Sequence, residues 1–109
     1  MANIYKNAKV DLTNNSETAV LTVPSDSRAI IKSIVVSEDS GNADSITLTI
    51  TDASSNVFSL FKTKAVSANA TVELLSQPLV LQESEILKAT AATADRLHIV
   101  VSMLEINRS

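Results

Sequence analysis

Hydrophobic and polar residues alternate along much of this chain with the two-residue period of a β-strand. The alternation is plainest over residues 46–51, where Ile46, Leu48 and Ile50 point to one side and the threonines between them to the other. This pattern predicts a strand with one buried face and one solvent-exposed face. Residues 29–36 are instead apolar on both sides, which predicts a more enclosed, central strand.

Between these two segments lie residues 38–44, seven small or polar residues that include Gly41, the single glycine of the chain. Turn-forming residues between two apolar strands are typical of a hairpin, so residues 28–52 are predicted to form a central β-hairpin with a long loop. The final segment, residues 96–106, is nearly apolar on both sides and is expected to lie beside residues 29–36. The core is predicted at Ile30, Ile34, Ile46, Leu48, Ile50, Leu97, Ile99 and Val101.

The rest of the chain predicts further short strands at intervals of about ten residues. They cover residues 4–13, 19–23, 57–62, 71–75, 79–81 and 86–91. The fold class that follows is all-β: a single antiparallel β-sandwich, jelly-roll-like, with eight or nine short strands in one domain over residues 1–109. Residues 84–93 are rich in Ala, Leu, Glu and Lys, so a helix is the alternative there.

The N-terminal segment has an apolar side that is interrupted by Lys6. An inward-pointing lysine is a common device for protecting the edge of a sheet. Residues 1–13 are therefore interpreted as an edge strand or an N-terminal arm.

Composition excludes several classes of function. The 109 residues are enough for one domain with one core, and there is no cysteine for a disulfide framework or thiolate chemistry. The net charge is -3 and the nine basic residues are scattered, which does not favour nucleic acid as a partner. The N-terminus has no apolar signal-peptide core, and no apolar run is long enough to span a membrane.

Candidate chemistry is sparse, and we predict no enzyme and no catalytic, cofactor-binding or metal-binding residues. The only histidine, His98, lies within an apolar strand and is expected to be a packing residue. Asp39, Asn42 and Asp44 could offer oxygens to calcium around Gly41, but their spacing is not that of an EF-hand. The same residue types are ordinary turn formers, so we interpret residues 39–44 as a solvated loop.

Several segments carry a resemblance to a known group of proteins. They are residues 21–24 (Leu-Thr-Val-Pro), 28–34 (Arg-Ala-Ile-Ile-Lys-Ser-Ile), 71–75, 78–81, 85–89, 94–97 and 104–106. With them, residues 19–106 resemble the short virion structural proteins of tailed bacteriophages, especially those of marine and cyanobacterial hosts. This resemblance implies a β-sandwich that assembles on the phage particle, and it supplies no catalytic or ligand residues.

The function expected from the resemblance is that of a capsid decoration, or cement, protein that stabilises the shell. A neck, tail or fibre-adaptor component is the alternative within the same class. A carbohydrate-binding module for host glycans is an alternative of another class, although Tyr5, Phe58 and Phe61 are the only aromatic residues. A small hydrolase is the weakest alternative.

The same resemblance implies partners and location. The expected partners are other virion proteins, the major capsid protein first, and further copies of the chain itself as a homo-oligomer such as a trimer. The expected location is the capsid surface of the virion, after synthesis in the host cytoplasm without a signal peptide.

Overall fold

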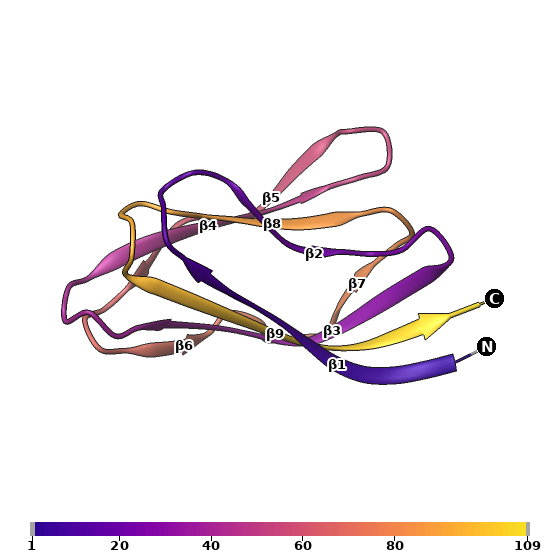
Figure 1. The fold of residues 1–109 in the computed structure, drawn as a ribbon, viewed down its shortest axis with the longest axis horizontal. Helices are drawn as coiled ribbons and strands as arrows, with labels where there is room; N and C mark the ends of the chain where they lie inside the picture. Colours follow the sequence, from indigo (N-terminus) through magenta and orange to yellow (C-terminus); the bar gives the residue numbers. More distant parts are fainter. Residues whose placement is uncertain (1, 109) are drawn as a thin grey trace.

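A computed structural model of the chain describes residues 2–108, in which two antiparallel β-sheets pack face to face (Figure 1). The lower sheet in Figure 1 has the strand order β1-β9-β3-β6, and β7 also pairs with β3. Its strands are β1 (Ala2–Leu12), β9 (Leu97–Asn107), β3 (Ser27–Glu38), β6 (Thr71–Glu73) and β7 (Leu79–Leu81). The upper sheet has the order β2-β8-β4-β5, with β2 (Thr18–Thr22), β8 (Ile86–Ala91), β4 (Asp44–Thr51) and β5 (Val57–Val66). The predicted all-β sandwich is confirmed, with nine strands.

The chain winds between the two sheets. Each of β1, β2 and β3 is followed by a strand in the opposite sheet, whereas β4 and β5 pair directly as neighbours. The resulting layers, 1-9-3-6 facing 2-8-4-5, have the winding of a jelly roll. Because β1 pairs with β9, the two ends of the described chain lie side by side (Figure 1).

The predicted central hairpin over residues 28–52 is wrong. β3 pairs with β9, β6 and β7, whereas β4 pairs with β5 and β8, so the two strands lie in different sheets. Both strands bury one face toward the same core from opposite sides, and the loop with Gly41 at φ 83° carries the chain across the sandwich. Alternation alone cannot separate these arrangements, because it is the same for strands in one sheet or in two.

The core prediction is correct at seven positions and wrong at Ile30. Seven of the predicted side chains are buried, six of them completely, but Ile30 lies on the outer face of the sheet and is half-buried. Its neighbours Ala29 and Ile31 are buried instead. A β-bulge between Ile31 and Ser33 adds one residue to β3 and changes the phase of the alternation, so positions before and after it cannot be extrapolated from one another.

Three other segments are now placed. Residues 86–91 form β8, so the helical alternative for residues 84–93 is wrong. β5 continues to Val66, four residues beyond the predicted end. Of residues 1–13, interpreted as an edge strand or arm, Ala2–Leu12 form the edge strand β1, which pairs with β9 in one unbroken register, and residue 1 lies outside the described residues.

Candidate functional site

The outer face of the five-stranded sheet carries a row of apolar side chains. Tyr5 of β1 lies opposite Leu104 of β9, Leu104 lies opposite Ile30 of β3, and Ile30 lies opposite Val80 of β7. Directly opposite residues in antiparallel strands share a face, so these four side chains form one line across four strands. We call them the apolar row.

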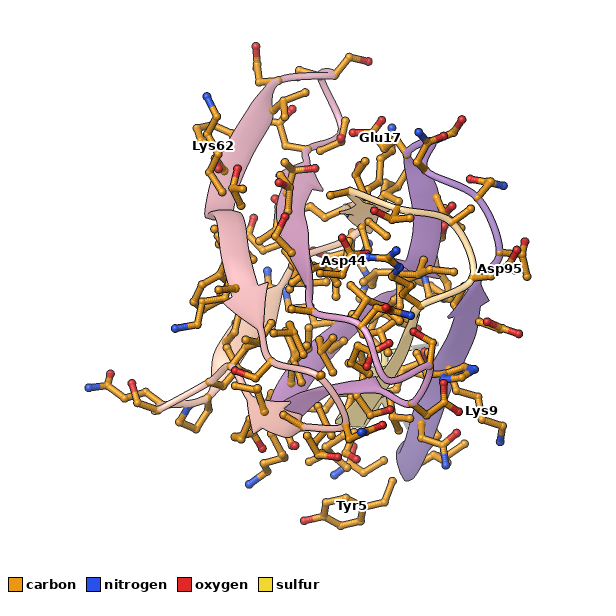
Figure 2. All side chains as sticks on the ribbon, turned by 90° about the vertical axis from the view of Figure 1, so that its left-hand side faces the viewer. Tyr5, Lys9, Glu17, Asp44, Lys62 and Asp95 are labelled. Atoms are coloured by element: carbon orange, nitrogen blue, oxygen red, sulfur yellow. The ribbon has the colours of Figure 1, made fainter. Side chains whose placement is uncertain are left out.

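The apolar row is open to solvent at both ends. Tyr5 is 74% exposed and Val80 53% exposed, whereas Ile30 and Leu104 between them are half-buried. Figure 2 shows the Tyr5 ring standing clear of the rest of the molecule. Val100, which is 38% exposed, lies on the same face of β9 but is separated from the row by Ser102. An apolar surface of this kind on a sheet that is already packed on its other face is typical of a protein interaction site.

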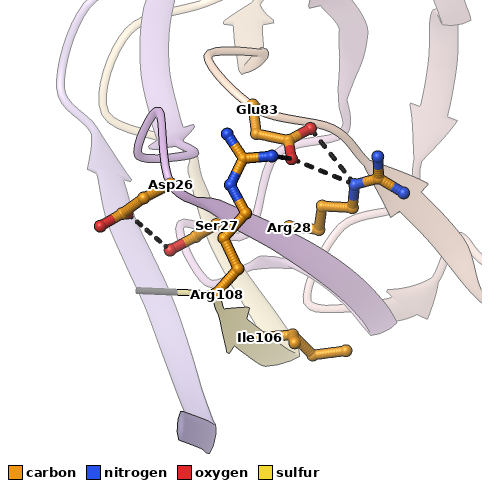
Figure 3. A pocket seen from close by; sticks show the side chains of 6 residues that line it. All are labelled: Asp26, Ser27, Arg28, Glu83, Ile106 and Arg108. Carbon is orange, nitrogen blue, oxygen red and sulfur yellow. Dashed lines mark hydrogen bonds and ion pairs between the residues drawn. The ribbon is translucent and has the colours of Figure 1, made fainter. Parts of the chain in front are cut away.

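One end of the sheet beside the apolar row carries a shallow pocket of about 230 Å³ (Figure 3). Arg28 Nε donates to both carboxylate oxygens of Glu83 at 3.2 and 3.3 Å, and Arg108 donates to the same carboxylate at 3.0 Å. The pKa of Glu83 lies below its usual range, first because the carboxylate accepts a hydrogen bond from its own backbone amide. Desolvation raises this pKa, but the guanidinium groups of Arg28 and Arg108 lower it further. The pocket is smaller than ordinary small-molecule sites, which begin at about 300 Å³, and an internal ion-pair network lines it.

His98 lies on the outer face and not in the core. Its Nε2 is 3.2 Å from Asp11 Oδ1 and its Nδ1 is 3.6 Å from Asp39 Oδ1, with 40% of its side chain exposed. The imidazole therefore lies between a carboxylate at the end of β1 and one in the loop after β3. Within residues 2–108, no group of three or more His, Cys, Asp or Glu side chains is arranged to hold a metal ion.

The loop of residues 39–44 is organised by Glu38, a residue that the sequence analysis overlooked. Glu38 is 2% exposed, and its carboxylate accepts hydrogen bonds from the backbone amides of Ser40, Gly41 and Asn42 at 2.9, 3.1 and 3.2 Å. The Ser40 hydroxyl and the amide of Asn69 donate to it as well, the latter at 3.0 Å. The sequence does carry a signal for this role: Glu38 lies on the same side of the strand as the buried Ile34 and Val36, directly before a run of turn-forming residues.

Hydrogen bonding to Glu38 outweighs the effect of its burial. Desolvation alone raises the pKa of this carboxyl, but the Ser40 hydroxyl and the amides of Asn69, Ser40 and Gly41 stabilise the charged form and lower the pKa to about 2. The charged carboxylate thus holds the loop that connects β3 to β4 in the opposite sheet. Asp44 is engaged separately, because its Oδ2 accepts a hydrogen bond from the Thr93 amide at 3.1 Å. Two of the three side chains considered for calcium, Asp39 and Asp44, therefore lie against different partners, His98 and Thr93.

Glu73 plays a similar part between β6 and β7. Its carboxylate accepts hydrogen bonds from the Ser33 hydroxyl and from the amides of Ile34 at 2.8 Å and Leu75 at 3.2 Å. These bonds outweigh desolvation and lower the pKa of Glu73. They also occupy backbone groups of β3 just past its bulge, where neither short strand pairs with it. Both carboxylates therefore stabilise local structure, Glu38 from a buried position and Glu73 from an exposed one.

Comparison with known proteins supports the fold. No protein-family model and no curated protein matches the sequence. A pilus protein of Bacillus endospore appendages, which form a family of disulfide-linked pili, is similar over 98% of this chain and 89% of that chain, at a TM-score of 0.58 and 10% identity. A chain of the acid-stable capsid of Helicobacter pylori bacteriophage KHP30 is similar over 97% of this chain and 89% of that chain, at a TM-score of 0.55 and 8% identity.

A weaker likeness is to a chain of the capsid of cyanophage Pam1, with a TM-score of 0.48 and 16% identity over 94% of this chain and 85% of that chain. This score is too low to establish a shared fold. The two stronger likenesses cover nearly the whole of this chain, so it shares the fold of a phage capsid chain and of a pilus subunit. In the described residues, no helix is long and apolar enough to cross a membrane.

Proposed function

We propose that this protein is a non-enzymatic structural component of a bacteriophage virion, specifically a capsid decoration protein that attaches to the shell through the apolar row. The observation that carries this proposal is the row itself. Tyr5 is 74% exposed and Val80 53% exposed on a sheet whose other face is packed against the core, so most of their surface is not used by the fold. Covering such a surface with a partner is the physical reason to keep it.

Two further findings support the proposal. The fold is that of a chain in the KHP30 capsid, and the sequence resembles short virion structural proteins of tailed phages. The pilus likeness is less suitable as a guide to assembly, because these 109 residues contain no cysteine and cannot supply disulfide links.

The physical task would be to add buried area across seams of the shell. A standard protein interface buries about 1,600 Å² in total, and attachment at many equivalent positions multiplies a modest gain at each one. A rigid sandwich suits this task, because little conformational freedom is lost when it attaches. The major capsid protein is the partner that this role requires.

Location in the intact particle tests the proposal. Electron microscopy of purified virions, with the copy number from quantitative mass spectrometry, should find the protein distributed over the shell in a fixed ratio to the major capsid protein. A few copies at one vertex would replace decoration by a neck, tail or fibre role. Absence from purified particles would overturn the assignment to the virion.

A pair of matched variants tests the surface. Val80→Asp places a charge in the apolar row, and Val57→Asp places the same charge on β5, where Val57 is 61% exposed. Val80→Asp should reduce rebinding to particles that lack the protein by at least about tenfold, because the buried charge would be unpaired. Val57→Asp should bind as the unchanged protein does. Equal binding by both variants would exclude the apolar row as the attachment surface.

A further inference from the structure

The sandwich has four sheet edges, and three of them have features that hinder pairing with a strand of another chain. An exposed edge presents unpaired backbone N–H and C=O groups, which can template a further strand. β6 and β7 are three residues each, and β2 is five residues with a register shift between Ala19 and Leu21. β5 is long, but its pairing with β4 shifts register twice and Thr63 has a left-handed φ of 55°.

The fourth edge, β1, has none of these features. It is 11 residues long, contains neither proline nor glycine, and pairs with β9 without a register shift. Its one inward-pointing charge, Lys6, is paired with Glu105 of β9 at 3.1 Å, so the lysine does not repel an approaching strand as an unpaired charge would. Ile4 and Tyr5 beside it are 53% and 74% exposed.

We propose that β1 pairs antiparallel with β1 of a second copy of this chain, about a two-fold axis at Asn7. This register pairs the whole length of the strand and forms on the order of ten main-chain hydrogen bonds, since each hydrogen-bonded pair exchanges two. A centre at Lys6 would set two lysines directly opposite, which is destabilising. A centre at Ala8 would leave the exposed start of the strand without a partner.

The Asn7 register is also the one in which opposing side chains match on both faces. On the inner face Ile4 meets an apolar residue, and on the outer face the Tyr5 ring meets a cation that it can attract through its face. Asn3 meets a carboxylate to which its amide can donate. The opposing pairs are Ile4 with Val10, Tyr5 with Lys9, Asn3 with Asp11, Asn7 with Asn7 of the second copy, and Lys6 with Ala8, where the lysine keeps its ion pair with Glu105 of its own chain.

Such pairing has a defined consequence for assembly. A two-fold contact uses the same surface on both copies and closes on itself, so it gives a dimer and neither a filament nor the trimer expected from the sequence. The two five-stranded sheets become one continuous layer, and the apolar rows of both copies lie on the same outer side. The edge contact does not depend on attachment to a capsid, so its test uses the isolated protein.

Single cysteines test the register, because the chain has no cysteine of its own. In the proposed dimer the two Asn7 positions face each other at about 4.5–5.5 Å between Cα atoms, within the range for a disulfide. The two Asn3 positions are about 27 Å apart, given a rise of about 3.4 Å per residue. Asn7→Cys should form a covalent dimer under mild oxidation, and Asn3→Cys, an equally exposed asparagine on the same face, should not.

Lysine substitutions at the same two positions test the location of the two-fold axis through the dissociation constant of the dimer. Asn7→Lys would place two lysines directly opposite each other, so the dissociation constant from analytical ultracentrifugation should rise at least about threefold and recover in high salt. Asn3→Lys would place a lysine opposite Asp11 and should leave dimerisation unchanged or stronger. Unchanged melting of both variants would show that each remains folded. Deletion of residues 1–12 is a poorer test, because it removes buried Leu12 and uncovers β9.

Two outcomes would overturn the proposal. One is a protein that sediments as a monomer up to its solubility limit. The other is self-association in which Asn3→Cys crosslinks as readily as Asn7→Cys, or in which Asn3→Lys and Asn7→Lys act alike, since either would place the contact elsewhere.

Discussion

The two faces of the five-stranded sheet are made from the same strands, yet they differ in kind. On the inner face of β3, Ile31, Ile34 and Val36 are completely buried. On its outer face, Ile30 is half-buried within the apolar row. The inner residues meet the opposite sheet, whereas nothing in the described chain covers Tyr5 and Val80. Apolar residues on the two sides of β3 thus lie in two different environments: those on one side form the core, and Ile30 on the other side belongs to the apolar row.

The two faces also differ in how charged side chains are stabilised. Among the described residues, the one buried charged residue of the inner face is Glu38, which is surrounded by donors that compensate for its lost hydration. On the outer face, ions such as Arg28 and Arg108 remain largely hydrated and pair at the surface. Substitutions on the inner face should therefore act on stability, and those on the outer face should act on association.

The largest contrast is expected between adjacent residues of β3. Ile31→Ala should reduce the free energy of unfolding by about 2–5 kcal/mol, because it leaves a cavity in the core. Ile30→Ala should cost about 1 kcal/mol or less, since Ile30 is already in contact with solvent. Urea denaturation of both variants measures this difference. Equal losses of stability would mean that Ile31 does not face the core, and Ile30 the outer side, in solution.

Removing the inner-face charge should give the next largest effect. Glu38→Gln should lower the melting temperature at neutral pH by several degrees, because the anionic acceptor for five donors is lost. Glu17→Gln is the control: Glu17 is an exposed glutamate near β2, ion-paired with Lys88 at 3.6 Å. It should melt as the unchanged protein does.

The same substitution should alter the response to acid. A pKa lowered to about 2 in the folded state means that Glu38 contributes its full stabilisation above its unfolded pKa of about 4.3 and loses it as the pH falls through about 2. The melting temperature of the unchanged protein should therefore fall between about pH 5 and pH 2, and Glu38→Gln should flatten part of that fall. Parallel curves would show that Glu38 does not titrate as its contacts indicate.

A smaller effect of opposite sign is expected on the outer face of the other sheet. Among the described residues, the buried Thr49 hydroxyl has no hydrogen-bond partner, whereas the hydroxyl of Thr47, two residues earlier on β4, accepts from the Thr63 amide at 3.0 Å. Thr49→Val should stabilise the protein by about 1 kcal/mol, because it removes an unpaired polar atom. Thr47→Val should destabilise it by about 1 kcal/mol. Matching signs in chemical denaturation would contradict this assignment.

The smallest change in stability is expected in the apolar row. Tyr5→Ser should alter the free energy of unfolding by no more than about 0.5 kcal/mol, since the ring is 74% exposed. It should, however, clearly shorten retention on a hydrophobic interaction column. A loss of stability comparable with that of Ile31→Ala would mean that the ring serves the fold after all.

The sequence by itself determined the strands and much of the core. Alternation along residues 46–51 identified Ile46, Leu48 and Ile50 as buried, and the two apolar phases of residues 96–106 placed that strand correctly beside β3. These features are local: a period of two follows from the geometry of any extended chain with one face toward a core. The same locality explains why the nine-strand sandwich was predictable.

Only the tertiary structure decided the remaining strand pairing and which apolar face is covered. Pairing depends on contacts between distant residues, so the link between β3 and β4 looked like a hairpin although it crosses the sandwich. One bulge residue reversed the phase that would have buried Ile30. The apolar row exists only because β1, β9, β3 and β7 lie side by side, and the anchoring by Glu38 requires the amide of Asn69, which is far away in the chain. Both arise from packing between elements, which no single segment of sequence encodes.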